Sequence, residues 1–404
     1  MLERKRDFNI LMVSTEYPPM QGGIGRYTYN LVKSLRAKGI EVKVLSNSDG
    51  LGDYTGLSPY NKKNSGVLYD LVQKLNPDIV HIQHEHGLIG FDMNPFFPNK
   101  TKTGLDKFYF MSKVPIVSTF HTSYNFKHWM QSIIIEGKDT FHLKYLYKIW
   151  KHLINYTSFR RANSYAMTKI SAGIVFSKHM ANLVPDTKVI FHGAEPFHSI
   201  EIDQKEARRI LLLPENERIV LVQGFLTASK GWNIIKKMYI PDGWKLVINY
   251  SKNHYNKQII DLHLDSKKNI INLGKDYLSE EDLSLLFFAS DIIFLPYKAI
   301  SGSGTMFDGL GHGKPFLASN TGFFKEFSKI GLGIVTERNA DSFEKGFKIV
   351  DENYKILKSQ VDEFRKKIKW DQIAEQHIDI YENILYAKRD KDIKLIESKL
   401  PEKP

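Results

Sequence analysis

Runs of apolar residues recur along this chain, and they are separated by segments long enough to form helices. Each run is continuous rather than alternating, which is typical of strands in a parallel sheet that helices cover on both faces. The runs are 8–14, 42–46, 78–83, 115–120, 172–177 and 188–192 in the first half, and 218–224, 244–250, 270–273, 291–296, 315–319 and 333–335 in the second. The pattern therefore predicts two α/β domains of similar kind.

The boundary between these domains is predicted where Gly-Ala-Glu-Pro-Phe-His interrupts the pattern, within residues 193–202. At 404 residues the chain is too long for one ordinary hydrophobic core. We therefore expect an N-terminal domain over 1–195, a C-terminal domain over 196–375 and, over 376–404, a helix with a charged tail.

The segment Ser301–Pro315 carries the clearest sign of chemistry. It reads Ser-Gly-Ser-Gly-Thr-Met-Phe-Asp-Gly-Leu-Gly-His-Gly-Lys-Pro and joins two apolar runs. A strand, a glycine-rich turn, a short helix and a second strand form a phosphate-binding unit, because small residues let backbone N–H groups approach an anion and the helix N-terminus favours negative charge. Asp308, one turn inside the helix, is placed to hold the diol of a ribose. The segment predicts a nucleotide-linked substrate.

A second glycine-rich segment follows the first apolar run. Pro18 and Pro19 stiffen it, and Gly22 and Gly23 permit close backbone approach where a helix begins. The segment lacks the G-x-G-x-x-G spacing and is longer than a standard dinucleotide-binding turn. By itself it is interpreted equally well as an ordinary glycine-rich turn.

Two single residues stand where open α/β sheets bind ligands, after the carboxyl ends of predicted strands. His121 directly follows the run 115–120, and its imidazole can donate to a sugar hydroxyl or a phosphate. Lys230 follows the run 218–224, and its ammonium group can neutralise a diphosphate. A structural histidine and a solvated loop lysine are the alternatives.

The run His81-Ile-Gln-His84-Glu85-His86 also lies at a strand end. His84 and His86 would share a face of an extended chain, so a metal site is one interpretation. The sequence has no second cluster with clear ligand spacing to complete it. We therefore favour a polar wall of a cleft over a metal site.

Charge and composition narrow the class of protein. A formal net charge of +12 implies an anionic partner, which can be a phosphorylated substrate, an acidic lipid surface or a nucleic acid. The positive charge is dispersed and no nucleic-acid-binding module is visible, so nucleic acid is disfavoured. No apolar run approaches the length of a membrane span, no secretory signal is evident, and there is no cysteine. We expect a cytoplasmic protein.

One helical stretch, 142–161, is basic and aromatic and contains neither Asp nor Glu. Amphipathic helices of this composition lie on anionic membranes. A helix that covers the first sheet and turns its lysines to solvent fits the stretch equally well. The membrane interpretation places the protein on the inner face of the cytoplasmic membrane, with a lipid-linked acceptor as in envelope polysaccharide assembly.

Taken in order, these segments resemble glycosyltransferase family 4, the large retaining family with the GT-B fold (glycosyl transferases group 1). The segments that carry the resemblance are Pro18-Pro19 with Gly22-Gly23, Thr119-Phe-His121, His192-Gly-Ala-Glu195, Gly224 to Lys230-Gly231, Ala289-Ser-Asp291 to Pro296, Asp308 to Gly313-Lys-Pro315, and Trp370 to Tyr381. The resemblance spans nearly the whole chain. Each motif alone is weak, but their shared order is specific.

The resemblance implies two Rossmann-like domains that face each other across a cleft, with the last helix packed back on the N-terminal domain. It implies a nucleotide-sugar donor on the C-terminal domain, an acceptor on the N-terminal one, and no metal or other cofactor. Lys230 would contact the diphosphate, Asp308 the ribose and His121 the transferred sugar. The other implied donor-binding residues are Gly22, Gly23, Ser301, Gly302, Ser303, Gly304, Thr305 and Met306.

Two positions depart from the family pattern. Phe225 stands where the family usually has an arginine, and Ile300 stands where it has the first of two glutamates, the second matching Asp308. Because that first glutamate helps to hold sugar hydroxyls, we expect a transferase with a non-standard sugar site. The same departures keep a non-catalytic nucleotide- or glycan-binding partner subunit open, and a sugar-nucleotide epimerase or phosphorylase of the same fold is the enzymic alternative.

Overall fold

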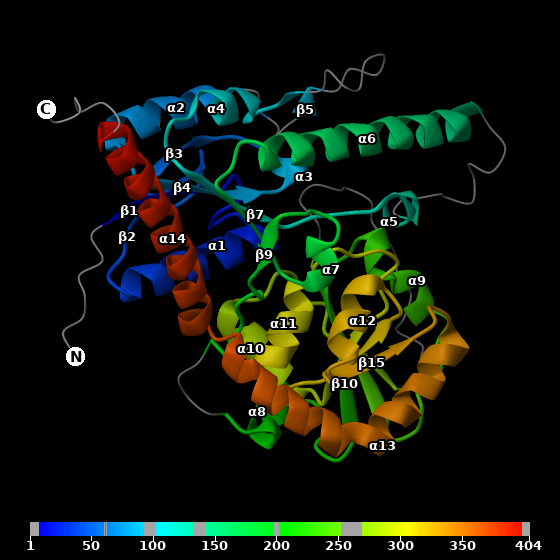
Figure 1. Ribbon diagram of the computed structural model, residues 1–404. Coiled ribbons are helices and arrows are strands. Elements are labelled where there is room, and N and C mark those ends of the chain that lie inside the picture. Colours follow the sequence, from blue (N-terminus) through cyan, green and yellow to red (C-terminus); the bar gives the residue numbers. More distant parts are fainter. Residues whose placement is uncertain are drawn as a thin grey trace, which may run out of the picture.

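Two parallel sheets organise the computed structural model (Figure 1). The structure describes residues 8–59, 61, 63–89, 91–92, 102–131, 143–197, 202–251 and 269–397. In Figure 1 the N-terminal sheet and its helices form the upper lobe, and the C-terminal sheet and its helices form the lower one.

The N-terminal sheet has seven strands in the order β3-β2-β1-β4-β7-β8-β9. Its strands are β1 (Asn9–Val13), β2 (Glu41–Asn47), β3 (Tyr54–Leu57), β4 (Ile79–His84), β7 (Ile116–Phe120), β8 (Ala172–Val175) and β9 (Thr187–Val189). Every residue of the central strands β4 and β7 is buried, as expected for parallel strands covered on both faces.

Helices connect these strands. They are α1 (Gly23–Ala37), α2 (Asn64–Leu75), α3 (His86–Ile89), α4 (Asp106–Met111), α5 (Phe126–Gln131), α6 (Leu143–Met167) and α7 (Lys178–Ala181). A small antiparallel pair, β5 (Phe91–Asp92) and β6 (Lys102–Thr103), lies outside the main sheet. Figure 1 shows α6 as a long helix that runs along the outer side of this domain.

The C-terminal sheet has six strands in the order β12-β11-β10-β13-β14-β15. Its strands are β10 (Arg218–Phe225), β11 (Trp244–Ser251), β12 (Ile270–Asn272), β13 (Ile292–Leu295), β14 (Phe316–Ser319) and β15 (Gly333–Thr336). Successive residues of β10 belong to different apolar clusters: Ile219 and Leu221 to one, Val220 and Val222 to the other. Apolar side chains therefore pack on both faces of this sheet.

The helices of this half are α8 (Gln204–Ile210), α9 (Trp232–Ile235), α10 (Glu280–Ala289), α11 (Gly304–Gly311), α12 (Gly322–Ser328) and α13 (Ala340–Phe364), with short 3-10 turns at η2 (Ala228–Lys230) and η3 (Arg365–Lys367). Helix α13 packs on one face through Phe343 and Phe347. Helices α11 and α12 pack on the other face through Phe307 and Phe323.

The last helix, α14 (Trp370–Glu397), returns to the N-terminal half and lies against α1 (Figure 1). Lys38, just after α1, pairs with Asp371 at 2.6 Å and with Glu375 at 3.2 Å. Deeper in the contact, the Tyr381 hydroxyl lies 2.6 Å from Nδ1 of His81 on β4. One apolar cluster includes residues of α1, α11 and α14, so both halves share a continuous core.

Each apolar run in the sequence overlaps a strand of these two sheets, so the predicted α/β architecture of two parallel sheets is confirmed. The pattern missed β3 and the β5–β6 pair. Strand β3 is a sheet edge in which Leu57 is its one buried residue, so it lacks a continuous apolar run.

Candidate active site

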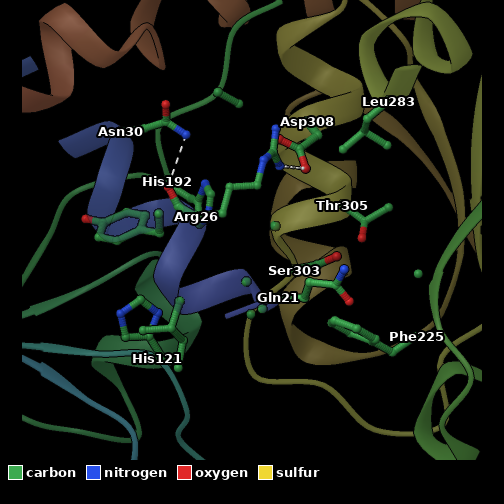
Figure 2. Close-up of a pocket in the computed structure, with 18 of the residues that line it drawn as sticks. Gln21, Arg26, Asn30, His121, His192, Phe225, Leu283, Ser303, Thr305 and Asp308 are labelled. Atoms are coloured by element: carbon green, nitrogen blue, oxygen red, sulfur yellow. Dashed lines mark hydrogen bonds and ion pairs between the residues drawn. The ribbon is translucent and has the colours of Figure 1, made fainter. Parts of the chain in front are cut away.

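A cavity of about 540 Å³ lies between the two domains, where strands of both sheets end. Its N-terminal wall contains Glu85 after β4 and His121 after β7, and its C-terminal wall contains Phe225 at the end of β10. Helices α1 and α11 border it from opposite domains (Figure 2). A cavity at this edge of two facing parallel sheets is the expected position for a ligand.

The N-terminus of α11 lies at the cavity. The hydroxyl of Ser303 accepts from the backbone N–H of Met306 at 3.1 Å and caps the helix. The predicted residues Gly302, Ser303, Gly304, Thr305 and Asp308 line the cavity. Ser301 and Met306 are buried and are not among the described residues that line it; the Met306 side chain belongs to the core.

Lys230 lies at the same cavity, and Tyr297 determines its position. Its ammonium group donates to the Tyr297 hydroxyl at 2.6 Å and lies 4.1 Å from the centre of that ring. Gly231 follows with φ +81°, and a Cβ there would meet the Pro296 carbonyl oxygen at 1.8 Å. Only glycine allows this close approach, which fixes where the lysine leaves the backbone.

His121 lines the opposite wall, and its Nε2 lies 2.8 Å from Oε1 of Gln83. Burial lowers the pKa of His121 to about 3, so the ring is neutral at neutral pH. Because the Gln83 oxygen accepts the Nε2 proton, the remaining ring nitrogen, Nδ1, is an acceptor. The ring therefore offers a ligand an acceptor rather than the donor considered from the sequence.

Gly22 and Gly23 line the cavity where α1 begins, but the chain itself supplies an anion to this helix. Oε1 of Glu16 accepts from the backbone N–H groups of Ile24 at 2.8 Å and Gly25 at 2.9 Å. A Cβ on Gly22 would lie 2.0 Å from the Glu16 carboxyl carbon, so the glycine makes room for this carboxylate. The first N–H groups of α1 are thus already occupied.

Arg26, which no sequence motif predicted as a site residue, crosses the cavity from α1 to the C-terminal domain. Its Nη1 lies 2.6 Å from Oδ2 of Asp308 on α11 (Figure 2). Its Nε lies 2.6 Å from Oε1 of Glu280 on α10. The attraction of Asp308 and Glu280 raises the pKa of Arg26 despite burial. The sequence signal was an arginine directly after Gly-Gly-Ile-Gly, but its partners are far away in the chain.

Of the described side chains in the run His81–His86, only Glu85 lines the cavity, so His81 and His84 do not form the predicted polar wall. His81 is fully buried between Tyr381 and Thr119, and His84 is buried beside Tyr109. Strand β4 is central, so its side chains point into the packed layers on both faces. Within the described part of the chain no three His, Asp or Glu side chains are grouped to hold a metal ion; the His86 side chain lies outside it.

The two departures from the family pattern have different surroundings. Ile300 is buried in the apolar cluster and is not among the described residues that line the cavity. Phe225 lines the cavity, with its ring 6.2 Å from that of Tyr277. Ile300 therefore places an apolar side chain in the core where the family has a glutamate. Phe225 places an aromatic ring in the cavity where the family usually has an arginine.

Comparisons with known proteins agree with this architecture. The model of Glycosyltransferase Family 4 matches residues 21–185, and no curated protein matches the chain. Sucrose-phosphate synthase from Thermosynechococcus elongatus is similar in structure, with a TM-score of 0.68, 14% identity, and coverage of 94% of this chain and 100% of that one. A glycosyltransferase from Rickettsia africae has a TM-score of 0.61 and 18% identity, covering 94% and 99%. HepE from Anabaena, solved with UDP and glucose, has a TM-score of 0.61 and 16% identity, covering 93% and 100%.

The fold shared with these structures is GT-B, so the predicted fold class is confirmed. In fold, and over the segment that the family model matches, the chain is therefore similar to the class of GT-B glycosyltransferases. Within that class it is family 4 whose model matches, over a segment that begins just before α1 and ends before β9, which confirms the resemblance seen in the sequence. Among the described helices, none combines the length and the apolar character needed to cross a membrane.

Proposed function

We propose that this protein transfers a sugar from a nucleoside-diphosphate donor to a hydroxyl group of a glycan or lipid-linked acceptor, with retention at the anomeric carbon and without a metal ion. One observation carries the proposal: the capped N-terminus of α11, the Lys230 ammonium group and the Asp308 carboxylate all line one interdomain cavity. A dipole, a cation and a diol acceptor are the groups that a nucleoside diphosphate requires. The complex of HepE with UDP and glucose supports this choice of donor.

In the proposed reaction the bond between the anomeric carbon and the phosphate oxygen breaks, and the acceptor oxygen bonds to the same face of the sugar. The acceptor proton passes to the departing phosphate. Lys230 and the N-terminus of α11 stabilise the negative charge that develops on the leaving group, so the step needs no metal ion. His121 accepts a hydrogen bond from a hydroxyl of the transferred sugar through Nδ1.

The acceptor would occupy the N-terminal wall. There Glu85 accepts a hydrogen bond from the Thr122 hydroxyl, and both residues line the cavity next to His121. A carboxylate, a hydroxyl and a neutral imidazole suit an acceptor with several hydroxyl groups. Burial of Ile300 leaves recognition of the donor sugar to other residues, which supports a non-standard sugar site.

A screen followed by a turnover assay tests the proposal. UDP-, GDP- and ADP-sugars are compared by thermal shift, because a bound ligand raises the apparent stability by mass action. The donor that binds is then incubated with glycan and lipid-linked acceptors, and transfer is measured. Binding without transfer to any acceptor would favour the non-catalytic partner subunit; conversion of the donor sugar itself would favour the epimerase.

We also propose that α6 contacts an anionic membrane. His142 lies outside the described residues, but the α6 side chains Leu146, Tyr147, Trp150 and Leu153 are exposed. Exposed Lys151 lies beside them, and Figure 1 shows the helix on the outer side of its domain. Apolar and aromatic side chains next to lysine suit the headgroup region of such a membrane.

Flotation with liposomes tests this contact. The parent protein is expected to float with anionic but not with neutral vesicles, and the double variant Trp150→Ser, Leu146→Ser is expected to remain in the bottom fraction. The matched control is Ile356→Ser, which removes an exposed apolar side chain from α13. Equal flotation of parent and double variant would refute a role for α6.

A further inference from the structure

Arg26 forms ion pairs that connect the two domains. The residue belongs to α1 of the N-terminal domain, and both of its carboxylate partners belong to the C-terminal domain. They are 254 and 282 residues away in the chain. One guanidinium group therefore links α1 to α10 and α11 across the cleft.

Burial makes this link stronger than an ordinary surface ion pair. The exposed fraction of the side chain is 22% for Arg26, 9% for Asp308 and 31% for Glu280. Solvent and salt screen partly buried charges less than exposed ones. Removing one partner of such a group leaves the other charges desolvated and uncompensated, which is more costly than the loss of a surface pair.

The charges around the cavity show what Arg26 compensates. Among the residues that the structure describes, five carboxylates line it, those of Glu16, Glu85, Glu195, Glu280 and Asp308, against the cations Arg26, Lys33 and Lys230. Without Arg26, Glu280 and Asp308 would add two uncompensated negative charges to the site of an incoming diphosphate. Arg26 removes this repulsion and, by holding Oδ2, fixes the orientation of the Asp308 carboxylate.

The pairing also constrains how Asp308 contacts a ligand. Its Oδ2 accepts a hydrogen bond from Arg26, and none of the described residues donates one to Oδ1, so Oδ1 is the oxygen left to accept from a diol. The helix α11 supplies the backbone position, and Arg26 supplies the side-chain orientation. A diol can then bridge the carboxylate and the adjacent guanidinium group.

We propose that Arg26 is a donor-positioning residue: it orients Asp308 for the ribose diol, neutralises Glu280 and Asp308, and holds the two domains together around the donor. The proposal rests on the proposed function, since it assigns Arg26 to the donor half of the same site. It makes discrimination at the ribose depend on a residue of the opposite domain, one that contacts Asp308 rather than the reacting atoms.

The test compares two nucleotides and two arginine variants. Whichever of UDP, GDP and ADP binds the parent is titrated calorimetrically, together with its 2′,3′-dideoxy form, into the parent and Arg26→Gln. We expect Arg26→Gln to weaken binding of the ribose form about tenfold or more and to bring both forms to nearly equal affinity. The control is Arg36→Gln, on the same helix, whose partner Asp53 at 2.6 Å lies within the N-terminal domain.

A second variant, Glu280→Gln, keeps the pairing of Arg26 with Asp308 and should preserve discrimination at the ribose. If Arg26→Gln fails to fold, Arg26→Lys replaces it, because a lysine keeps the charge but cannot contact both carboxylates in the same fork. Discrimination in the Arg26 variant equal to that of Arg36→Gln overturns the proposal alone. A parent that binds none of the three diphosphates overturns the proposed function as well.

Discussion

At the scale of single residues, Lys230 shows how the charge of a lysine in a loop is held in one position. The Tyr297 hydroxyl and ring hold its ammonium group, and Gly231 fixes the backbone that follows. Tyr297 is itself buried, so the lysine is held by a rigid group rather than by solvent. A cation that is already in place loses little conformational entropy when an anion binds.

Lys230→Ala should therefore weaken binding of the preferred nucleoside diphosphate by roughly tenfold or more, because a charged contact is lost. Calorimetric titration measures the change. Lys345→Ala, which removes an exposed lysine from α13 of the same domain, is the control for net charge. Affinity that stays at the level of this control would contradict the role of Lys230.

The sequence predicted individual residues of the cavity where a residue type and a strand end coincided. His121 and Lys230 were found in this way, Asp308 was found from its place in the helix after a glycine-rich turn, and all three line the cavity. Arg26 was missed because its function depends on two carboxylates of the other domain. The sequence also could not show which ring nitrogen of His121 carries the proton, because that depends on Gln83, which lies on a neighbouring strand.

At the scale of elements, the segment around Gly231 joins β10 to the N-terminus of α9 and carries Lys230 into the cavity. Gly231→Ala would place its Cβ against the Pro296 carbonyl and force a left-handed backbone on alanine. Together these effects should lower the free energy of unfolding by about 2–5 kcal/mol. Denaturant unfolding measures it.

The matched control is Gly243→Ala, because Gly243 has nearly the same φ, +82°, with no atom near an added Cβ. That variant isolates the cost of the backbone conformation, about 1–2 kcal/mol. Equal losses at both positions would mean that the close approach to Pro296 contributes nothing.

Strands could be predicted from the sequence wherever helices bury both faces of the strand along its whole length. The central strands β4, β7 and β13 are such cases, and their apolar runs predicted them directly. The N-terminus of α1 was predicted as a glycine-rich turn, but not its occupation by Glu16. That contact depends on how the loop folds back between β1 and α1, which spacing alone does not determine.

At the scale of the whole molecule, the interior holds a group of histidines that are kept neutral. Burial lowers the pKa of His121 to about 3 and those of His192, His312 and His377 to about 4, and it places the pKa of His81 well below 6.5. They come from the N-terminal domain, from the end of α11 and from α14, so they report on the folded chain as a unit. In the unfolded chain each has an ordinary pKa near 6.5.

This difference predicts how stability depends on pH. Between about pH 4 and 6.5 the unfolded chain binds more protons than the native one, so the free energy of unfolding rises with pH. The stabilisation is fully present above about pH 6.5 and is lost as the pH falls toward 4. Each histidine adds a slope that approaches about 1.4 kcal/mol per pH unit. Chemical unfolding between pH 5.5 and 7.5 should show the free energy falling steeply on the acid side.

His377→Gln removes one of these histidines from α14. It should reduce the slope of the free energy of unfolding against pH by the contribution of one histidine. Its control is Ile378→Val, the neighbouring buried residue, which should lower stability by about 0.5–1.5 kcal/mol at every pH and leave the slope unchanged. A slope in His377→Gln equal to that of Ile378→Val would contradict a neutral, buried His377. Because His377 contacts Tyr27 of α1 across the α14 interface, a reduced slope also means that His377 takes up its proton only when the contact between the last helix and the N-terminal domain is lost.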